Sequence, residues 1–175
     1  RLNDLFKFSK KHKIKLASIE DLISYRLKYE KLVKRFSSKT SIIKDRGKIN
    51  IYNYKNKLEK NINYVITKGK FNQKKSIPVR VFSTKIKNKN ILNNSKIKKS
   101  LKVLMKYKNF LLLIINNKNT LDKDNNISTL RYYGIGAQII KDLNVKNMIL
   151  ISRSRKKIIG LEGFGLKIKK QVIIK

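Results

Sequence analysis

The sequence predicts an α/β fold, in the broad sense that includes α+β, with a mixed sheet and flanking helices. Segments in which apolar and polar residues alternate are separated by segments with apolar residues at helical spacing. A continuous apolar run at residues 110–115 is typical of a strand that is buried on both faces. The early strands follow one another closely, whereas the later ones alternate with helices. We therefore expect antiparallel strands first and partly parallel strands afterwards.

Residues 1–36 have the pattern of a helix, a short strand and a second helix. Apolar side chains lie at helical spacing within residues 4–12, and residues 14–16 alternate as a strand would. Ser18 and Asp21 form a shortened capping box, which predicts that the second helix begins there. These elements are too few to bury a core alone, so we expect them to be the end of a larger domain.

Residues 37–175 contain all the other predicted elements. Each is assigned from the period of its apolar residues. In order, they are a hairpin with strands around 49–51 and 62–66, a strand at 79–81, a helix around 97–105, a strand at 110–115, a polar loop at 116–126, a helix around 135–143, a strand at 148–151, a short helix near 157–161 and a strand at 166–174.

The composition excludes several kinds of chemistry. The 175 residues include no cysteine and one histidine, so disulfides, cysteine-ligated metals and a cysteine nucleophile are excluded. The ten acidic residues are scattered, which leaves little material for acid–base or metal-dependent catalysis. The longest apolar run, 110–115, is far shorter than the roughly 20 residues of a membrane-spanning helix. We expect a soluble, cytoplasmic protein that has no membrane partner.

The chain is strongly basic, with 45 Lys and Arg against 10 Asp and Glu and a net charge of +35. Such a charge is typical of nucleic-acid-binding domains. However, lysine supplies most of it and is spread along the whole chain, and the codons of the abundant Lys, Ile and Asn are rich in A and T. Drift in an AT-rich genome therefore explains the charge, and we expect contact with nucleic acid to be only incidental.

The beginning of the chain resembles the interior of a longer one. The first residue is Arg1, not methionine, and an amphipathic pattern starts at once with Leu2 and Leu5. We therefore expect this sequence to be a fragment that continues upstream.

Three stretches in the last third carry a specific family resemblance. They are LRYYGIGAQIIKDLN at 130–144, LISRSRKK at 150–157 and GLEGFGL at 160–166. Together they resemble the C-terminal part of GTP cyclohydrolase II, which implies a fold of that family.

The head of the chain resembles a second family. Residues 1–5, 8–12 and 18–26 are similar to the last helix, strand and helix of 3,4-dihydroxy-2-butanone 4-phosphate synthase. The two enzymes occur fused in this order in riboflavin biosynthesis. The resemblance thus implies the C-terminal part of such a fusion, with residues 1–36 as the tail of the synthase domain and 37–175 as a cyclohydrolase-II-like domain.

The resemblance also implies that the cyclohydrolase-like domain is degenerate. In that family three cysteines, spaced C-x10-C-x-C after a strand, hold the zinc ion that serves catalysis. The aligned positions here are Lys85, Lys96 and Lys98. An ammonium group has no lone pair for a metal, so we expect this chain to bind no zinc and to need no other cofactor.

Other family site positions are only partly kept. Arg131 matches the arginine of the family's Asp-x-Arg motif, whereas Thr129 replaces the aspartate. Ser152 and Lys157 match parts of a segment that approaches guanine and phosphate. Residues 116–120 do not match the family's Arg-Gln-Glu-Gly-Arg segment. We interpret Arg131 as a remnant of the catalytic site and Ser152 and Lys157 as remnants of the nucleotide site, although each also fits a structural or surface role.

These observations lead to one functional prediction and two alternatives. The parent protein is expected to be a lyase that converts ribulose 5-phosphate with Mg²⁺, using residues upstream of Arg1, while the domain described here is inactive and structural. Its partner is then the upstream synthase domain, and the resemblance also suggests a homodimer. The alternatives are a non-catalytic nucleotide- or phosphate-binding module and a basic nucleic-acid-binding protein.

Overall fold

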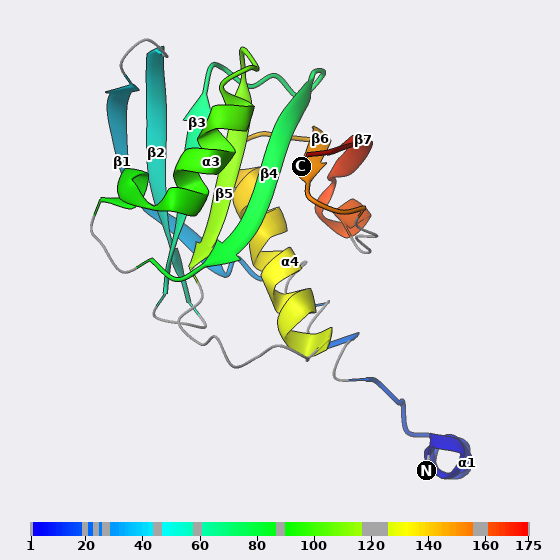
Figure 1. Ribbon diagram of the computed structural model, residues 1–175. Coiled ribbons are helices and arrows are strands. Elements are labelled where there is room, and N and C mark those ends of the chain that lie inside the picture. The colour runs from blue at the N-terminus through cyan, green and yellow to red at the C-terminus, as the bar shows by residue number, and fades with distance from the viewer. Residues whose placement is uncertain are drawn as a thin grey trace.

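A mixed sheet of seven strands forms the centre of the fold (Figure 1). The computed structural model describes residues 2–18, 21–22, 25, 29–43, 47–57, 61–86, 90–116, 126–155 and 161–174, with the side chains of all but 126–133 and 162. Along the chain the elements are α1 (Leu2–His12), β1 (Val33–Ile43), β2 (Gly47–Asn56), β3 (Ile62–Lys68), β4 (Ser76–Thr84), the 3₁₀ helix η1 (Ile91–Asn93), α3 (Ser95–Leu104), β5 (Phe110–Asn116), α4 (Asn126–Asp142), β6 (Asn147–Ser152), the 3₁₀ helix η2 (Leu161–Phe164) and β7 (Lys167–Ile173).

The strand order is β1-β2-β3-β5-β4-β6-β7. The pairs β1–β2, β2–β3 and β3–β5 are antiparallel. The pairs β4–β5, β4–β6 and β6–β7 are parallel. The predicted fold class, with antiparallel strands first and parallel strands afterwards, is therefore confirmed.

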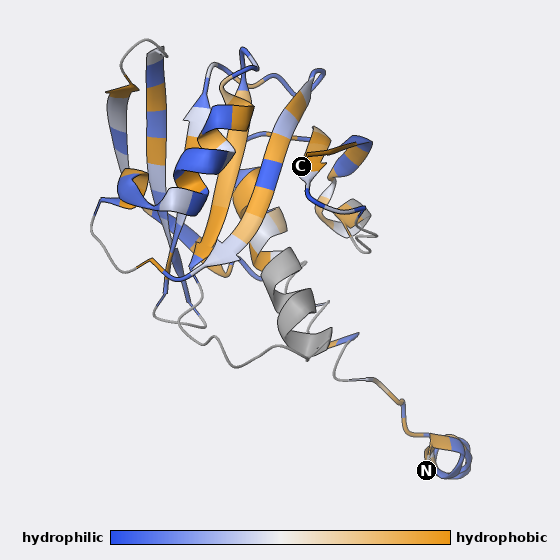
Figure 2. Ribbon diagram, in the orientation of Figure 1, coloured by the Kyte–Doolittle hydropathy of each residue, from blue (hydrophilic) through white to orange (hydrophobic). Residues whose placement is uncertain are grey.

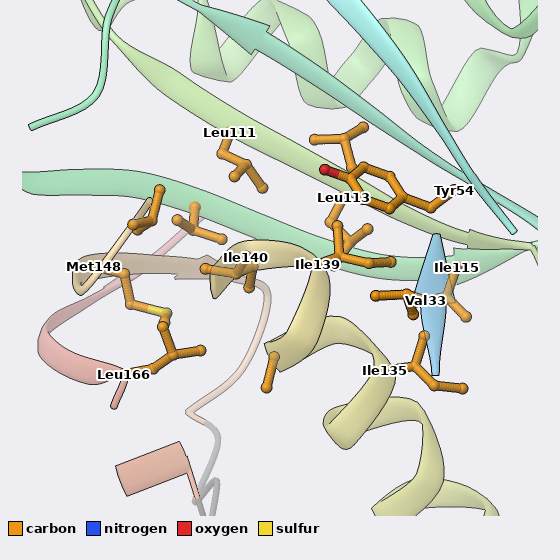
Figure 3. Close-up of a cluster of buried hydrophobic side chains, with 14 of the residues drawn as sticks. Val33, Tyr54, Leu111, Leu113, Ile115, Ile135, Ile139, Ile140, Met148 and Leu166 are labelled. Atoms are coloured by element: carbon orange, nitrogen blue, oxygen red, sulfur yellow. The ribbon is translucent and has the colours of Figure 1, made fainter. Parts of the chain in front are cut away.

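Strand β5 is the most deeply buried part of the sheet, since all seven of its residues are buried. Leu111, Leu113 and Ile115 pack with residues of α4 on one face, and Figure 3 shows this cluster around Ile135 and Ile139. The alternate residues of β5 belong to a second cluster, on the face covered by α3. Figure 2 shows β5 as an almost continuously hydrophobic strand. The period of two along a strand explains why one apolar run serves both faces.

Helix α4 approaches β5 closely at one glycine. A Cβ atom at Gly136 would lie 3.4 Å from Leu113 Cδ2. The absence of a side chain at this position thus lets α4 lie directly on the sheet. Among the described residues, no helix is both long and apolar enough to cross a membrane.

The long edge strand β1 is an element that the sequence analysis does not predict. Of its eleven residues, Val33 alone is buried, so no apolar alternation marks the strand. It forms instead by pairing along its whole length with β2, with a register shift between Arg35 and Ser37. The predicted domain boundary between residues 36 and 37 lies inside this strand, and it stays a prediction.

The short strand predicted at residues 14–16 is wrong, because residues 14–18 have no regular secondary structure. Helix α1 ends with Lys13 in the left-handed region, at φ 53°. The Ile14 N–H then donates to the Ser9 carbonyl at 3.0 Å. This is a helix C-cap, so the backbone of residue 14 closes a helix and pairs with no strand.

The predicted start of the second helix is confirmed by its capping contacts. The Asp21 N–H donates to Ser18 Oγ at 2.9 Å, and the Ser18 N–H donates to Asp21 Oδ2 at 3.3 Å. The segment that leads into β1 is then held by Gln138 of α4. Its side chain accepts from the Leu32 N–H at 3.0 Å and donates to the Glu30 carbonyl at 2.8 Å.

Helix α1 buries none of its residues. Its apolar side chains Leu5, Phe6 and Phe8 are each more than half exposed, at 52%, 51% and 56%. Figure 1 shows α1 well apart from the sheet. Within the described part of the chain, its apolar face is therefore uncovered.

Candidate functional site

The carboxyl ends of β4, β5 and β6 lie at one edge of the sheet, since these strands are parallel. In open α/β sheets this is the edge at which ligands bind. Thr84, the last residue of β4, pairs with Asn116, the last residue of β5. Lys85 follows β4 directly, and Ser152 ends β6. The structure thus brings two of the predicted site residues to the same edge.

Lys96 and Lys98 lie in the first turns of α3. Asn94 caps this helix, because its Oδ1 accepts from the N–H groups of Lys96 at 3.0 Å and of Ile97 at 3.3 Å. The side chains of Lys85, Lys96 and Lys98 are all exposed. The partial positive charge of the helix N-terminus adds to these ammonium groups. The side chains that the sequence resemblance aligns with the family's zinc ligands therefore repel a cation and offer it no ligand.

No alternative metal site replaces these positions in the described part of the chain. It contains no group of three or more His, Cys, Asp or Glu side chains that could hold a metal ion. The residues present therefore do not fit zinc.

The remaining predicted residues differ in what the structure describes of them. Ser152 Oγ donates to the Ser154 carbonyl at 2.7 Å, so its hydroxyl stabilises the local turn. Arg131 belongs to α4 by its backbone, but its side chain is outside the described part, as is the whole of Lys157. The role of Arg131 as a remnant of the catalytic site, and those of Ser152 and Lys157 in nucleotide binding, stay predictions.

Asn116 opens the segment that does not match the family's Arg-Gln-Glu-Gly-Arg sequence. Its Oδ1 accepts from the Ile86 N–H at 3.0 Å, and its own N–H donates to Asn63 Oδ1 at 3.1 Å. Residues 117–120 lie outside the described residues. The Oδ1 atom of Asn116 thus holds the chain that leaves β4.

Arg80, the middle residue of β4, is a buried cation that the sequence analysis does not identify as a site residue. It is 8% exposed. Its Nε donates to Ser100 Oγ at 3.0 Å, and its Nη1 donates to the Ile151 carbonyl at 3.5 Å. Its guanidinium carbon lies 6.0 Å from the centre of the Phe82 ring. The available signal is a single arginine within the otherwise apolar residues 77–82.

The charge of Arg80 is not neutralised within the described residues, because no carboxylate there contacts it. Burial lowers the pKa of Arg80, and the nearby charge of Arg153 lowers this pKa further. A buried cation without an opposite charge is stabilised when an anion approaches. The guanidinium of Arg80 can therefore attract an anionic group, whereas the described residues include no cluster of side chains that could hold a metal ion.

Comparison with known proteins agrees with this architecture. Residues 91–173 match the sequence model of the family GTP cyclohydrolase II. The riboflavin biosynthesis protein RibBA of Aquifex aeolicus is 30% identical over 204 aligned residues, which cover 100% of this chain and 50% of that protein. A 3,4-dihydroxy-2-butanone 4-phosphate synthase of Photobacterium phosphoreum is 30% identical over 179 residues, which cover 92% of this chain and 49% of that protein.

A solved structure shows the same fold. It is RibBX, a two domain 3,4-dihydroxy-2-butanone 4-phosphate synthase from A. baumannii, with a TM-score of 0.69 and 27% identity. The similarity covers 99% of this chain and 50% of RibBX. The chain thus spans about half the length of the relatives that it matches.

Residues 91–173 are therefore similar to the GTP cyclohydrolase II class of proteins. The chain as a whole is a homologue of the riboflavin biosynthesis proteins of the RibBA type and of 3,4-dihydroxy-2-butanone 4-phosphate synthases. The family resemblance given by the sequence motifs is confirmed.

Proposed function

We propose that this chain is the C-terminal half of a 3,4-dihydroxy-2-butanone 4-phosphate synthase of riboflavin biosynthesis, and that its cyclohydrolase-II-like domain is non-catalytic. The observation that carries the proposal is the set of three exposed lysines, Lys85, Lys96 and Lys98, at the family's zinc positions. Replacement of three thiolates by three ammonium groups changes the formal charge of the site from negative to positive. Such a site supplies no metal-bound nucleophile for opening the purine ring.

The neighbouring residues do not compensate for this loss. The side chains of Asn116 and Ser152 form hydrogen bonds to the backbone of this chain. Thr129 stands where the family motif has an aspartate, so a general acid or base is also missing there. What is retained is the packing of β5 against both helices, as expected for a domain kept for its fold.

The N-terminal helix supports an upstream partner domain. The apolar side chains of α1 are exposed here, and exposed apolar patches of this kind mark contact surfaces. In the proposed protein they pack on the synthase domain of the same polypeptide, which acts on ribulose 5-phosphate with Mg²⁺ in the cytoplasm. A homodimer, as the family resemblance suggests, belongs to the same proposal.

The proposal is tested by measuring the release of formate from each of two substrates by the full-length protein that carries this chain. We expect formate from ribulose 5-phosphate with Mg²⁺, and none above the blank from GTP with Mg²⁺ and Zn²⁺. Release of formate from GTP would overturn the non-catalytic assignment. An intact mass of about 20.6 kDa for the protein from its native cell would overturn the fusion, since that is the mass of this chain alone.

A second candidate function is non-catalytic binding of a nucleotide or phosphate. It is favoured by the buried charge of Arg80, which no carboxylate contacts in the described part of the chain. Titration calorimetry with GTP and ATP distinguishes it from non-specific attraction. Guanine-selective binding that resists salt would support this function. Binding that falls steeply with salt and ignores the base would contradict it, because counter-ion release alone behaves in that way.

A further inference from the structure

A basic depression lies at the opposite edge of the sheet, where β4 and β5 begin. Figure 1 shows this edge above the one that carries Thr84 and Asn116. The depression has a volume of about 740 Å³. Its lining includes five lysines, which come from β2, from β3 and from the loops before β4 and β5: Lys48, Lys68, Lys70, Lys75 and Lys108.

The sheet pairing brings these lysines together. Lys68, the last residue of β3, pairs with Phe110, the first residue of β5. The loops that follow β3 and precede β5 therefore leave the sheet side by side. Their lysines are far apart in sequence but surround one hollow.

The two loops are fixed to each other by one hydrogen bond and one close approach. Asn109 Nδ2 donates to the Lys70 carbonyl at 2.9 Å. Gly69 has φ +75°, and a Cβ atom there would collide with the side-chain amide of Asn109. The backbone under the lysines is thus held in place before any ligand arrives.

The lining favours an anion with several charges. No acidic side chain lines the depression among the described residues, so the five ammonium groups repel one another without an internal counter-ion. The Debye length is about 8 Å at physiological ionic strength. Charges that surround one hollow are close enough together that salt screens their repulsion only partly. Lysine binds phosphate as a point charge.

The same lining does not favour a nucleobase. No aromatic side chain faces the depression in the described part of the chain. Proteins that bind single-stranded nucleic acids stack the bases on aromatic side chains. The side chains that line this hollow are therefore suited to bind phosphate groups and not bases.

We propose that this depression is a binding site for a phosphate-dense anion of the oligophosphate class. It is separate from the edge that matches the cyclohydrolase site. The nine-residue strand β4 joins the two edges, and at about 3.3 Å per residue they are about 26 Å apart. None of the lining lysines belongs to the candidate cyclohydrolase site, so this binding site does not depend on whether the domain is catalytic.

The test uses the full-length protein and inorganic tripolyphosphate as the probe, in titration calorimetry at about 150 mM salt. The variant K70Q/K108Q removes two charges from the hollow. The control variant K34Q/K55Q removes two charges from exposed lysines that face each other across β1 and β2. Melting curves of both variants show whether the fold is kept.

We expect saturable binding with one site per chain. It should weaken at least about tenfold in K70Q/K108Q and less than about twofold in K34Q/K55Q, because only the first pair contacts the ligand. Equal weakening in both variants, or no saturation with the unaltered protein, would overturn the site. Preferential binding of a single-stranded RNA over tripolyphosphate at equal phosphate concentration would also overturn it, in favour of a nucleic-acid surface.

Discussion

The Tyr54 hydroxyl donates to Asp142 Oδ2 at 2.7 Å and so joins β2 to the last residue of α4. Tyr54 is fully buried. Arg35 of β1 and Lys31 lie near the same carboxylate, with nitrogen–oxygen distances of 3.8 Å and 4.0 Å. One aspartate thus connects the antiparallel half of the sheet with the helix that covers it.

We expect Tyr54→Phe to destabilise the protein by about 1 to 1.5 kcal/mol, the usual contribution of one such hydrogen bond. The ring stays in the core, so the loss is confined to the hydroxyl and its partner. Urea unfolding measures the change. Tyr52→Phe is the matched control, because Tyr52 is only partly buried and lies on the same strand. An equal loss in both variants would contradict the role of the Asp142 contact.

The same tyrosine predicts a pH dependence. Burial raises the pKa of Tyr54, and the hydrogen bond to Asp142 raises this pKa further, while the charge of Arg35 opposes the shift. In the unfolded chain a tyrosine ionises near pH 10, whereas the folded protein keeps Tyr54 neutral. The stabilisation from Tyr54 is therefore complete below about pH 10 and is lost as the pH rises further, by up to about 1.4 kcal/mol per pH unit.

Unfolding of the original protein and of Tyr54→Phe at several values between about pH 9 and 11 checks this prediction. The difference in stability between the two proteins should narrow above about pH 10, because phenylalanine does not titrate. A difference that stays constant across this range would show that Tyr54 is not held neutral by its surroundings.

Gly69→Ala and Gly47→Ala separate backbone strain from steric collision. Both glycines have positive φ, +75° and +86°, so each alanine costs about 1 to 2 kcal/mol in backbone conformation. At Gly47 nothing lies within 4 Å of the added Cβ. At Gly69 the added Cβ must displace Asn109, which also breaks its bond to Lys70, at a further cost of about 1 kcal/mol. Thermal unfolding should therefore show the larger loss for Gly69→Ala, and equal losses would contradict the fixed loop.

Three cysteine substitutions test whether the degenerate site keeps the family geometry. We expect K85C/K96C/K98C to bind about one zinc ion per chain, because three thiolates replace the ammonium groups at aligned positions. GTP should still not be turned over, since Thr129 and the 116–120 segment remain changed. Elemental analysis measures zinc, and formate release measures turnover.

The control for this experiment is K85C/K96C/K99C, which has the same number of thiols but moves one of them to the next position of α3. It should hold much less zinc. If the two triple variants bind zinc equally, the aligned positions do not form the family site.

The sequence predicts those elements in which the buried residues recur at the period of a helix or a strand. The apolar run of β5 and the helical spacing in α3 are examples, because side-chain burial repeats with the geometry of a single element. Strand β1 could not be found in this way, since its one buried residue leaves no period and its stability comes from pairing with β2. Residues 14–16 show the opposite case. Their apolar and polar residues alternate, but alternation without a paired neighbouring strand does not make a strand.

For the candidate site, the sequence by itself predicts that the zinc ligands of the cyclohydrolase family are replaced. The ammonium groups of lysines at positions 85, 96 and 98 have no lone pair for a metal. The tertiary structure alone decided that Arg80 is a buried cation that no carboxylate contacts within the described residues, and that five of the many lysines surround one hollow. Residue identity fixes what a side chain can do chemically, whereas its charge environment depends on strand order, which brings distant residues together.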